Sequence, residues 1–291
     1  MDTGGVTHAT TYRRRLGMIA LGAARVGVIA YLSILLLMSF LETRLVFPAP
    51  SPESGDWSPA GGDYEEAWID VPAIPGAKAA RVYGWFFDKP DAEHVVLYCH
   101  GNGNDLSDLP ELARLLRDRL NAAVLVWDYR GYGESEGTPN EAGVIADGLA
   151  SQRWLAERTG RTPADIVVIG RSIGGGVATA IAAEQGAALL VLQSTFTSLP
   201  DAAATHYPWL PVHWVMQNRF NSLERIQRYK GPVLVSHGTK DEVVPFEQGQ
   251  WLYDAAPGRK RFVEIPEGLH RHAQPLAYYD DILAMLAEGH N

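Results

Sequence analysis

Cysteine is almost absent from this sequence, because Cys99 is the only one among 291 residues. A disulfide framework within the chain and a zinc site built from cysteines are therefore excluded. Positive charge is also scarce: 25 Lys and Arg residues stand against 34 Asp and Glu residues, for a net charge of −9 at pH 7. Without a basic excess the chain has no electrostatic footprint for polyanions, so we expect no nucleic-acid partner.

Motifs that bind metals or phosphate-containing cofactors are missing as well. The nine histidines include no H-E-x-x-H or similar spacing, so no metal is implied. The glycine run at 174–176 is not followed by G-K-[ST] and does not have the G-x-G-x-x-G register. We therefore expect an activity that needs no cofactor.

Apolar residues, in contrast, are plentiful enough for a full core. They make up 46% of the chain, and charged residues make up 20%, which is close to the average for globular proteins. A length of 291 residues is long for one small domain and short for two ordinary ones. These values indicate a single large α/β domain with an appendage.

The appendage is an apolar N-terminal segment, for which we predict a transmembrane anchor over 16–41. Its only charge is Arg25, and 26–41 is dense in Leu, Ile, Val and Met. This uncharged stretch spans only about 24 Å as a helix, against roughly 30 Å of hydrocarbon, so Arg25 should lie near one interface. A cleaved signal peptide is the alternative, but bulky residues at 45–48 stand where signal peptidase needs small ones.

Charge sets the expected orientation of this anchor. Because Arg13, Arg14 and Arg15 precede it, the positive-inside rule predicts a cytoplasmic N-terminal tail over 1–15. The same rule places 49–291 on the far side of a single-pass membrane protein. Several prolines and glycines give 42–62 the composition of a linker, and we assign the catalytic domain to 63–291.

Beyond the linker, short β-branched segments alternate with longer segments of helical spacing. Eight strands are predicted, over 66–71, 80–87, 95–99, 123–128, 166–170, 189–193, 233–236 and 261–265, with helices over 106–120, 141–158, 173–184, 246–256 and 273–287. This alternation requires crossover connections, which build a mostly parallel sheet with flanking helices, while the first two strands can form an antiparallel hairpin. The long interval 194–231 predicts a small lid insert at the carboxyl edge of the sheet.

One glycine-flanked serine lies between a predicted strand and a predicted helix. The segment 170–174 reads G-R-S-I-G, so Ser172 follows the strand directly and precedes a helix of small residues. This context is typical of a nucleophile elbow, in which a sharp turn holds the serine hydroxyl above the sheet. A glycine-rich turn without a catalytic role is the plain alternative, because the pattern by itself is weak.

A serine hydroxyl needs a base, and the base needs a carboxylate that orients it. In this arrangement the acid and then the histidine should follow the serine along the chain. Asp241 follows the seventh predicted strand, with Glu242 as a weaker alternative, and His270 follows the eighth. His272 is the rival base, but we expect it to begin the final helix. The predicted catalytic residues are Ser172, Asp241 and His270.

The tetrahedral intermediate also needs backbone N–H donors for its oxyanion. Ile173 follows the nucleophile at the positive end of its helix and should supply one donor. The loop after the third strand reads H-G-N-G-N over 100–104, and Asn102 should supply the other.

With these parts assembled, the chain resembles the α/β-hydrolase superfamily, and more narrowly its membrane-anchored Bem46-like group, which is related to the ABHD hydrolases. The resemblance covers 45–287 and depends on L-V-F-P (45–48), H-G-N-G (100–103), D-Y-R-G-Y-G-E-S-E-G (128–137), G-R-S-I-G-G (170–175), G-T-K-D-E-V-V-P (238–245) and G-L-H (268–270). It implies an α/β-hydrolase fold with the triad and oxyanion amides named above. The group often has H-N-D at the histidine, where this chain has H-R-H (270–272).

We therefore expect a membrane-anchored serine hydrolase that cleaves carboxylic esters or acyl thioesters through an acyl-enzyme intermediate. Tethering near a bilayer favours small-molecule or lipid acyl esters as substrates. The aromatic stretch 206–214 fits the wall of an acyl pocket, a lipid contact or a plain cover for its own domain. A serine peptidase of the same fold and a catalytically silent hydrolase-fold binding protein are the alternatives.

Overall fold

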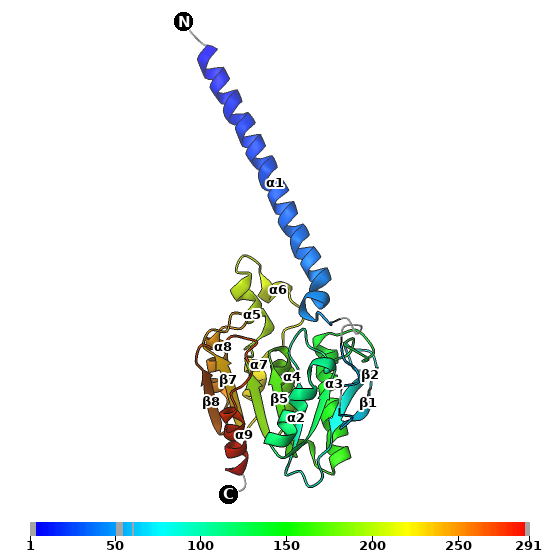
Figure 1. Ribbon diagram of the computed structural model, residues 1–291. Coiled ribbons are helices and arrows are strands. Elements are labelled where there is room, and N and C mark those ends of the chain that lie inside the picture. Colours follow the sequence, from blue (N-terminus) through cyan, green and yellow to red (C-terminus); the bar gives the residue numbers. More distant parts are fainter. Residues whose placement is uncertain (1–3, 51–54, 60, 289–291) are drawn as a thin grey trace. The chain divides into compact units, whose positions relative to one another are not determined.

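The computed structural model describes residues 4–50, 55–59 and 61–288, without the side chains of 4–17. The chain divides into two compact units, of which the first ends at Glu42 and the second begins at Thr43. Helix α1 (Gly4–Val46) forms the described part of the first unit and continues into the second (Figure 1).

From Met18 onward helix α1 is long and apolar enough to cross a membrane, and large apolar side chains along it are exposed. A signal sequence near an N-terminus shares these features. The predicted anchor at 16–41 lies inside this helix, which also takes in 4–15 of the predicted tail. Residues 1–3 of that tail lie outside the described residues. The helix ends before Pro48, because proline disfavours helical backbone at the residue that precedes it.

The second unit is built on a mostly parallel sheet of eight strands. Their order across the sheet is β1-β2-β4-β3-β5-β6-β7-β8, and β2 pairs antiparallel with both β1 and β4 while the other pairs are parallel. The strands are β1 (Glu65–Val71), β2 (Ala80–Phe87), β3 (His94–Cys99), β4 (Ala122–Trp127), β5 (Ile166–Arg171), β6 (Leu189–Gln193), β7 (Val233–Gly238) and β8 (Lys260–Ile265). The predicted sheet and its antiparallel hairpin are confirmed.

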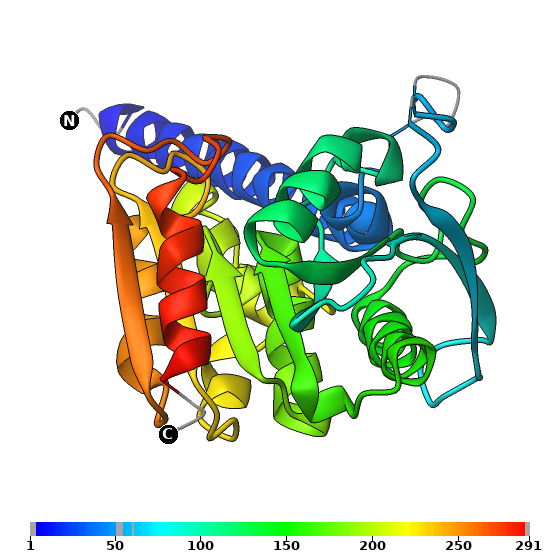
Figure 2. The ribbon, with the colours of Figure 1, turned by 60° about the horizontal axis from the view of Figure 1, so that its bottom comes forward.

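Helices cover both faces of the sheet (Figure 2). They are α2 (Pro110–Arg119), α3 (Glu141–Thr159), α4 (Ile173–Gln185), α8 (Phe246–Ala255) and α9 (Ala277–Ala287), with short 3-10 turns at Leu106–Asp108 and Pro163–Asp165. One core contains α2 and α9, and the other contains α3, α4 and α8. Strand side chains alternate between them, since Leu97 lies in one core and Val96 and Tyr98 in the other. Burial on both faces explains why the central strands are apolar throughout.

The catalytic domain predicted over 63–291 starts later in the chain than the compact unit that contains it. The second unit begins at Thr43 and not at residue 63. Val46 and Phe47 are only 8% and 4% exposed and belong to its core. Within the stretch predicted as a linker, the described residues Val46 and Phe47 therefore pack on the rest of the second unit.

The lid insert consists of α5 (Leu199–His206), α6 (Val212–Val215) and α7 (Ser222–Ile226). Helix α7 packs on α4, whereas α5 and α6 project beyond the sheet (Figure 1). Three aromatic residues of α6 and of the turn between α5 and α6 are exposed: Tyr207, Trp209 and Trp214. The insert is therefore small, and part of its surface is aromatic and exposed.

Candidate active site

Ser172 occupies the sharp turn between β5 and α4. Its backbone has φ 52° and ψ −120°, a conformation that residues other than glycine rarely adopt. Three hydrogen bonds hold it there: its N–H donates to the Gln193 carbonyl at 2.9 Å, and its carbonyl accepts from the Gly175 N–H at 2.9 Å and the Thr195 hydroxyl at 2.6 Å. The turn therefore has the strained geometry of a nucleophile elbow.

Glycine is required at Gly170 and Gly174 by close backbone approach. A Cβ at Gly174 would overlap the carbonyl oxygens of Cys99 and His100, and one at Gly170 would overlap the Gly174 carbonyl. These contacts allow α4 to begin directly against the carboxyl end of β3. The nucleophile turn and the loop after β3 are thereby brought side by side.

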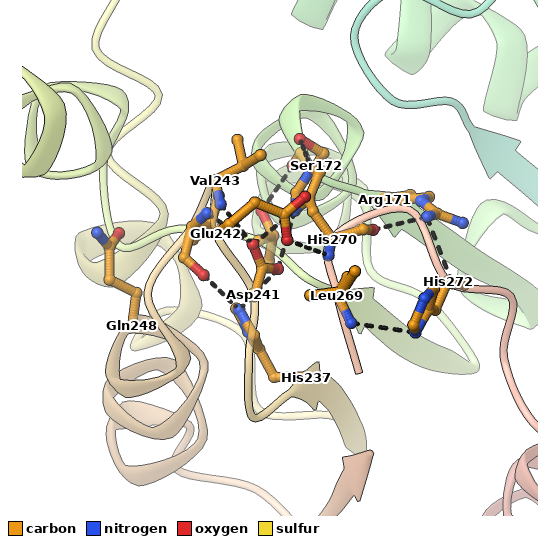
Figure 3. Close-up of polar contacts among 12 residues, drawn as sticks. Arg171, Ser172, His237, Asp241, Glu242, Val243, Gln248, Leu269, His270 and His272 are labelled. Carbon is orange, nitrogen blue, oxygen red and sulfur yellow. Dashed lines mark hydrogen bonds and ion pairs between the residues drawn. The ribbon is translucent and has the colours of Figure 1, made fainter. Parts of the chain in front are cut away.

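The structure brings Ser172, Asp241 and His270 together (Figure 3). His270 Nε2 lies 3.1 Å from Ser172 Oγ, and His270 Nδ1 lies 2.8 Å from Asp241 Oδ2 and 3.0 Å from Oδ1. The His270 side chain is 12% exposed and the Asp241 side chain is fully buried. Their positions match the requirements of a nucleophile, a base and an orienting acid.

His272 does not reach this group. It is exposed, and its Nδ1 accepts a hydrogen bond from the Leu269 N–H at 3.2 Å (Figure 3). The expectation that His272 begins the last helix is wrong, because α9 begins at Ala277. Pro275 explains the delay, since the residue before a proline is disfavoured in a helix.

Asp241 is held as a carboxylate by the loop that follows β7. Its Oδ1 accepts from the Val243 and Val244 N–H groups at 2.9 and 2.8 Å, and His237 Nε2 lies 3.3 Å from its Oδ2. Burial alone would raise the pKa of Asp241, but the hydrogen bonds from His237, His270 and the Val244 amide lower it well below its ordinary value. Asp241 can therefore stay ionised beside the imidazole throughout the neutral range.

Two residues that were not among the predicted catalytic residues, Arg171 and Glu242, hold the backbone of His270. The His270 N–H donates to Glu242 Oε2 at 3.1 Å, and the His270 carbonyl accepts from Arg171 Nη2 at 2.7 Å. Arg171 is adjacent to Ser172, and Glu242 is adjacent to Asp241. Glu242, the alternative acid in the sequence, thus contacts the main chain of the base and not its ring.

The expected oxyanion donors lie in the two segments that meet at the elbow. Among the described residues, no hydrogen-bond partner is found for the backbone N–H of Asn102 or Ile173. A Cβ on Gly101 would lie 3.7 Å from the Ser172 Cβ, which places the loop after β3 next to the nucleophile. Unpaired amides at this place are suited to a developing negative charge.

The signature at 128–137 contacts and supports the loop after β3. Tyr129 stacks on His100 with ring centroids 4.1 Å apart, and its hydroxyl donates to the His100 carbonyl at 2.6 Å. Tyr132 donates to Asn102 Oδ1 at 3.2 Å, and Asp128 accepts from the Leu106 N–H at 2.9 Å. Sequence reasoning found this motif but could not derive its contacts, which join residues far apart in the chain.

His100 sits in this support and not in the reacting group. Its ring is fully buried, with Nδ1 bonded to the Gly101 carbonyl at 2.8 Å and Nε2 lying 3.5 Å from Asp128 Oδ1. Burial lowers the pKa of His100 to about 4 and raises the pKa of Asp128 well above its ordinary value. In the part of the chain that the structure describes, no group of three or more His, Cys, Asp or Glu side chains is arranged to hold a metal ion.

Comparison with known proteins finds hydrolases. A family described as serine aminopeptidase, S33, matches residues 90–224. Protein bem46 of Schizosaccharomyces pombe is 32% identical over 69% of this chain and 70% of its own length. The α/β-hydrolase domain-containing protein WAV2 of Arabidopsis thaliana is 30% identical over 84% of this chain and 85% of its own.

Two further matches extend this comparison. The lysophosphatidylserine lipase ABHD12 of Danio rerio is 34% identical over 66% of this chain and 56% of its own length. Among solved structures, the Pyrococcus furiosus esterase Pf2001 superposes with a TM-score of 0.65 over 83% of this chain and 96% of its own, at 19% identity. At that identity the structural match concerns the fold.

Proposed function

Because the chain belongs to the α/β-hydrolase family, in its Bem46 and ABHD branch, we propose that it is a serine hydrolase of carboxylic esters or acyl thioesters. The observation that carries the proposal is the placement of His270 between the Ser172 hydroxyl at 3.1 Å and the Asp241 carboxylate at 2.8 Å. Family membership supports hydrolysis, and this contact supports a serine nucleophile.

In the proposed reaction His270 Nε2 takes the proton of the Ser172 hydroxyl while Oγ attacks the acyl carbon. Asp241 accepts the hydrogen bond of Nδ1 and stabilises the imidazolium that forms. Collapse of the tetrahedral intermediate breaks the bond to the leaving alcohol or thiol, which receives the proton from His270. A water molecule, deprotonated by His270, then attacks the acyl carbon; the bond to Ser172 Oγ breaks, the acid is released, and His270 returns the proton to Oγ.

Two backbone amides are assigned to the oxyanion in this proposal. The Ile173 N–H is the first donor of α4, where the helix dipole adds positive potential. The Asn102 N–H comes from the loop after β3. Removing one donor of this kind typically costs about 10²–10³ in kcat.

We also propose that α1 retains the protein at a membrane, with the N-terminal tail in the cytoplasm and the hydrolase unit on the opposite side. The length and apolar character of the helix and the arginines at 13–15 support this topology. A relative named for lysophosphatidylserine hydrolysis supports acyl esters of lipids as one substrate class. Acyl esters of small molecules form the other.

A serine peptidase is the second candidate, and the matched family description favours it. Acyl-enzyme chemistry cleaves amides with the same groups, so substrate trials must include both classes. A catalytically silent binding protein is the third possibility that the trials address.

A fluorophosphonate probe tests the proposal on the full chain in detergent. We expect labelling of wild type and no labelling of Ser172→Ala, with loss of turnover on the order of 10⁴-fold or more. A panel of p-nitrophenyl esters, acyl thioesters and aminoacyl amides then separates esterase from peptidase. Labelling that persists in Ser172→Ala would identify another nucleophile, and no labelling of folded wild type would favour a silent hydrolase fold.

A further inference from the structure

The last turn of helix α1, which already belongs to the hydrolase unit, contacts the loop over 100–104 after β3, here named the oxyanion loop. Asn102 Nδ2 donates to the Val46 carbonyl at 2.9 Å, and Asn102 Oδ1 accepts from the Tyr132 hydroxyl at 3.2 Å. Both ends of the Asn102 amide are therefore held, although the residue itself is exposed. We infer that Val46 and Phe47 are positioning residues of the active site, acting on the Asn102 backbone through its side chain; this inference rests on the proposed function.

The Val46 carbonyl is free to accept this bond because of the prolines that follow it. A helical carbonyl normally accepts from the N–H four residues later, but that residue is Pro50, which has no N–H. The Ala49 N–H donates to the Phe47 carbonyl instead. The last turn of α1 thus ends in an orphan carbonyl, and Asn102 satisfies it from 56 positions away.

The segment is fixed firmly enough to act as a support. Phe47 is 4% exposed and meets Phe220 edge to face, with ring centroids 6.2 Å apart. Phe220 in turn packs on α4, where a Cβ on Gly176 would lie 3.0 Å from it. The other support, Tyr132, is fully buried. Val46 and Phe47 therefore connect the oxyanion loop with the packing behind the nucleophile helix.

The loop that carries Asn102 needs such support. Gly101 and Gly103 flank Asn102, and Gly103 has φ 75°, so the backbone there is conformationally free. The backbone–backbone hydrogen bond within this loop, from the Asn104 N–H to the Gly101 carbonyl, is long at 3.5 Å. An oxyanion donor acts only within about 2.7–3.1 Å of the charge, so a loosened Asn102 should raise the barrier and leave substrate binding little changed.

The test compares Asn102→Ala, Tyr132→Phe and Phe47→Ala with wild type in the full chain, purified in detergent. Steady-state hydrolysis of one p-nitrophenyl ester gives kcat and KM, and a trifluoromethyl ketone of the same acyl chain gives Ki. For Asn102→Ala we expect kcat to fall about 10- to 30-fold, KM to stay within about threefold, and Ki to rise in proportion to the loss of kcat/KM. Tyr132→Phe and Phe47→Ala should show the same pattern to a smaller degree.

Two matched variants control for the loss of similar bonds elsewhere. Asn140 Nδ2 donates to the Gly76 carbonyl at 2.9 Å, and the buried Tyr229 hydroxyl donates to the Ala187 carbonyl at 2.8 Å, both outside the catalytic group. Asn140→Ala and Tyr229→Phe should keep kcat and Ki within about twofold of wild type. The double variant Phe47→Ala/Asn102→Ala should be no slower than Asn102→Ala, because both changes break one connection.

Hydrogen exchange at 100–104 provides a readout that does not depend on turnover. Exchange there should accelerate at least about fivefold in Phe47→Ala and Asn102→Ala and stay unchanged in Asn140→Ala. Unchanged exchange, fully additive losses, or an effect confined to KM would each overturn the inference. A wild type without turnover or probe labelling would refute the proposed function alone, since the exchange experiment would still decide whether Val46 and Phe47 hold the loop.

Discussion

The guanidinium of Arg171 donates a 2.7 Å hydrogen bond to the backbone carbonyl of His270, across 99 positions of sequence. The residue that precedes Ser172 thereby holds the loop that carries His270, the proposed base. Since Glu242 accepts from the His270 N–H, the peptide groups on both sides of the base are tied to neighbours of the other two triad residues. The geometry of the proposed triad is thus linked through its backbone as well as through its side chains.

We predict that Arg171→Leu lowers kcat/KM about tenfold, because an unrestrained His270 spends less time within reach of Ser172. Arg171→Lys should recover part of the loss, since lysine retains a donor. Arg153→Leu, which removes an exposed arginine from α3, should leave the rate unchanged. Ester kinetics at matched folded fraction checks this, and equal rates for Arg171→Leu and wild type would contradict it.

The two late histidines should differ sharply. His270→Ala is expected to reduce turnover about as severely as Ser172→Ala, because the base that contacts Ser172 Oγ is removed. His272→Ala should cost less than about tenfold, roughly 1.4 kcal/mol of barrier. Both rates are to be measured on preparations whose thermal melts show the same folded fraction. If His272→Ala abolished turnover while His270→Ala reduced it only slightly, the base would be His272 and not His270.

Asp241 should make stability depend on pH in a defined direction. The pKa of Asp241 is lower in the folded chain than its ordinary value, so its contribution is complete above about pH 4 and is lost as the pH falls toward the folded-state pKa. Asp241→Asn should therefore lower the free energy of unfolding at pH 7 by about 2 kcal/mol. Urea unfolding at pH 7, 5, 4 and 3 should show that difference shrinking below pH 4, and a constant difference would refute the linkage.

The start of the hydrolase unit can be located by truncation. A chain that begins at Thr43 retains Val46 and Phe47, whereas one that begins at Ser51 loses both from the core. Removing a buried Phe costs about 3–5 kcal/mol, which corresponds to a melting temperature roughly 10 °C lower for a domain of this size. Calorimetry of the two chains checks this. Equal melting temperatures would restore the linker interpretation of 43–50.

Much of the architecture follows from local sequence patterns. The central strands are short, β-branched and apolar on both faces, which is possible only between two layers of helices. The elbow at Ser172 is determined by glycines at 170 and 174, because a side chain at 170 would overlap the Gly174 carbonyl and one at 174 would overlap the carbonyls of Cys99 and His100. The order of Ser172, Asp241 and His270 along the chain could also be predicted, because parallel strands deliver their following loops to one edge.

Tertiary structure alone decided what surrounds those residues. No periodicity could show that β2 pairs antiparallel with β4, that Arg171 reaches His270, or that Val46 and Phe47 belong to the core. The physical reason is that a local pattern records which face of an element is apolar, whereas each of these contacts joins segments distant in sequence. A proline-rich stretch reads as a linker from its composition, and only the partners of its buried side chains and orphan carbonyl show that it is part of the domain.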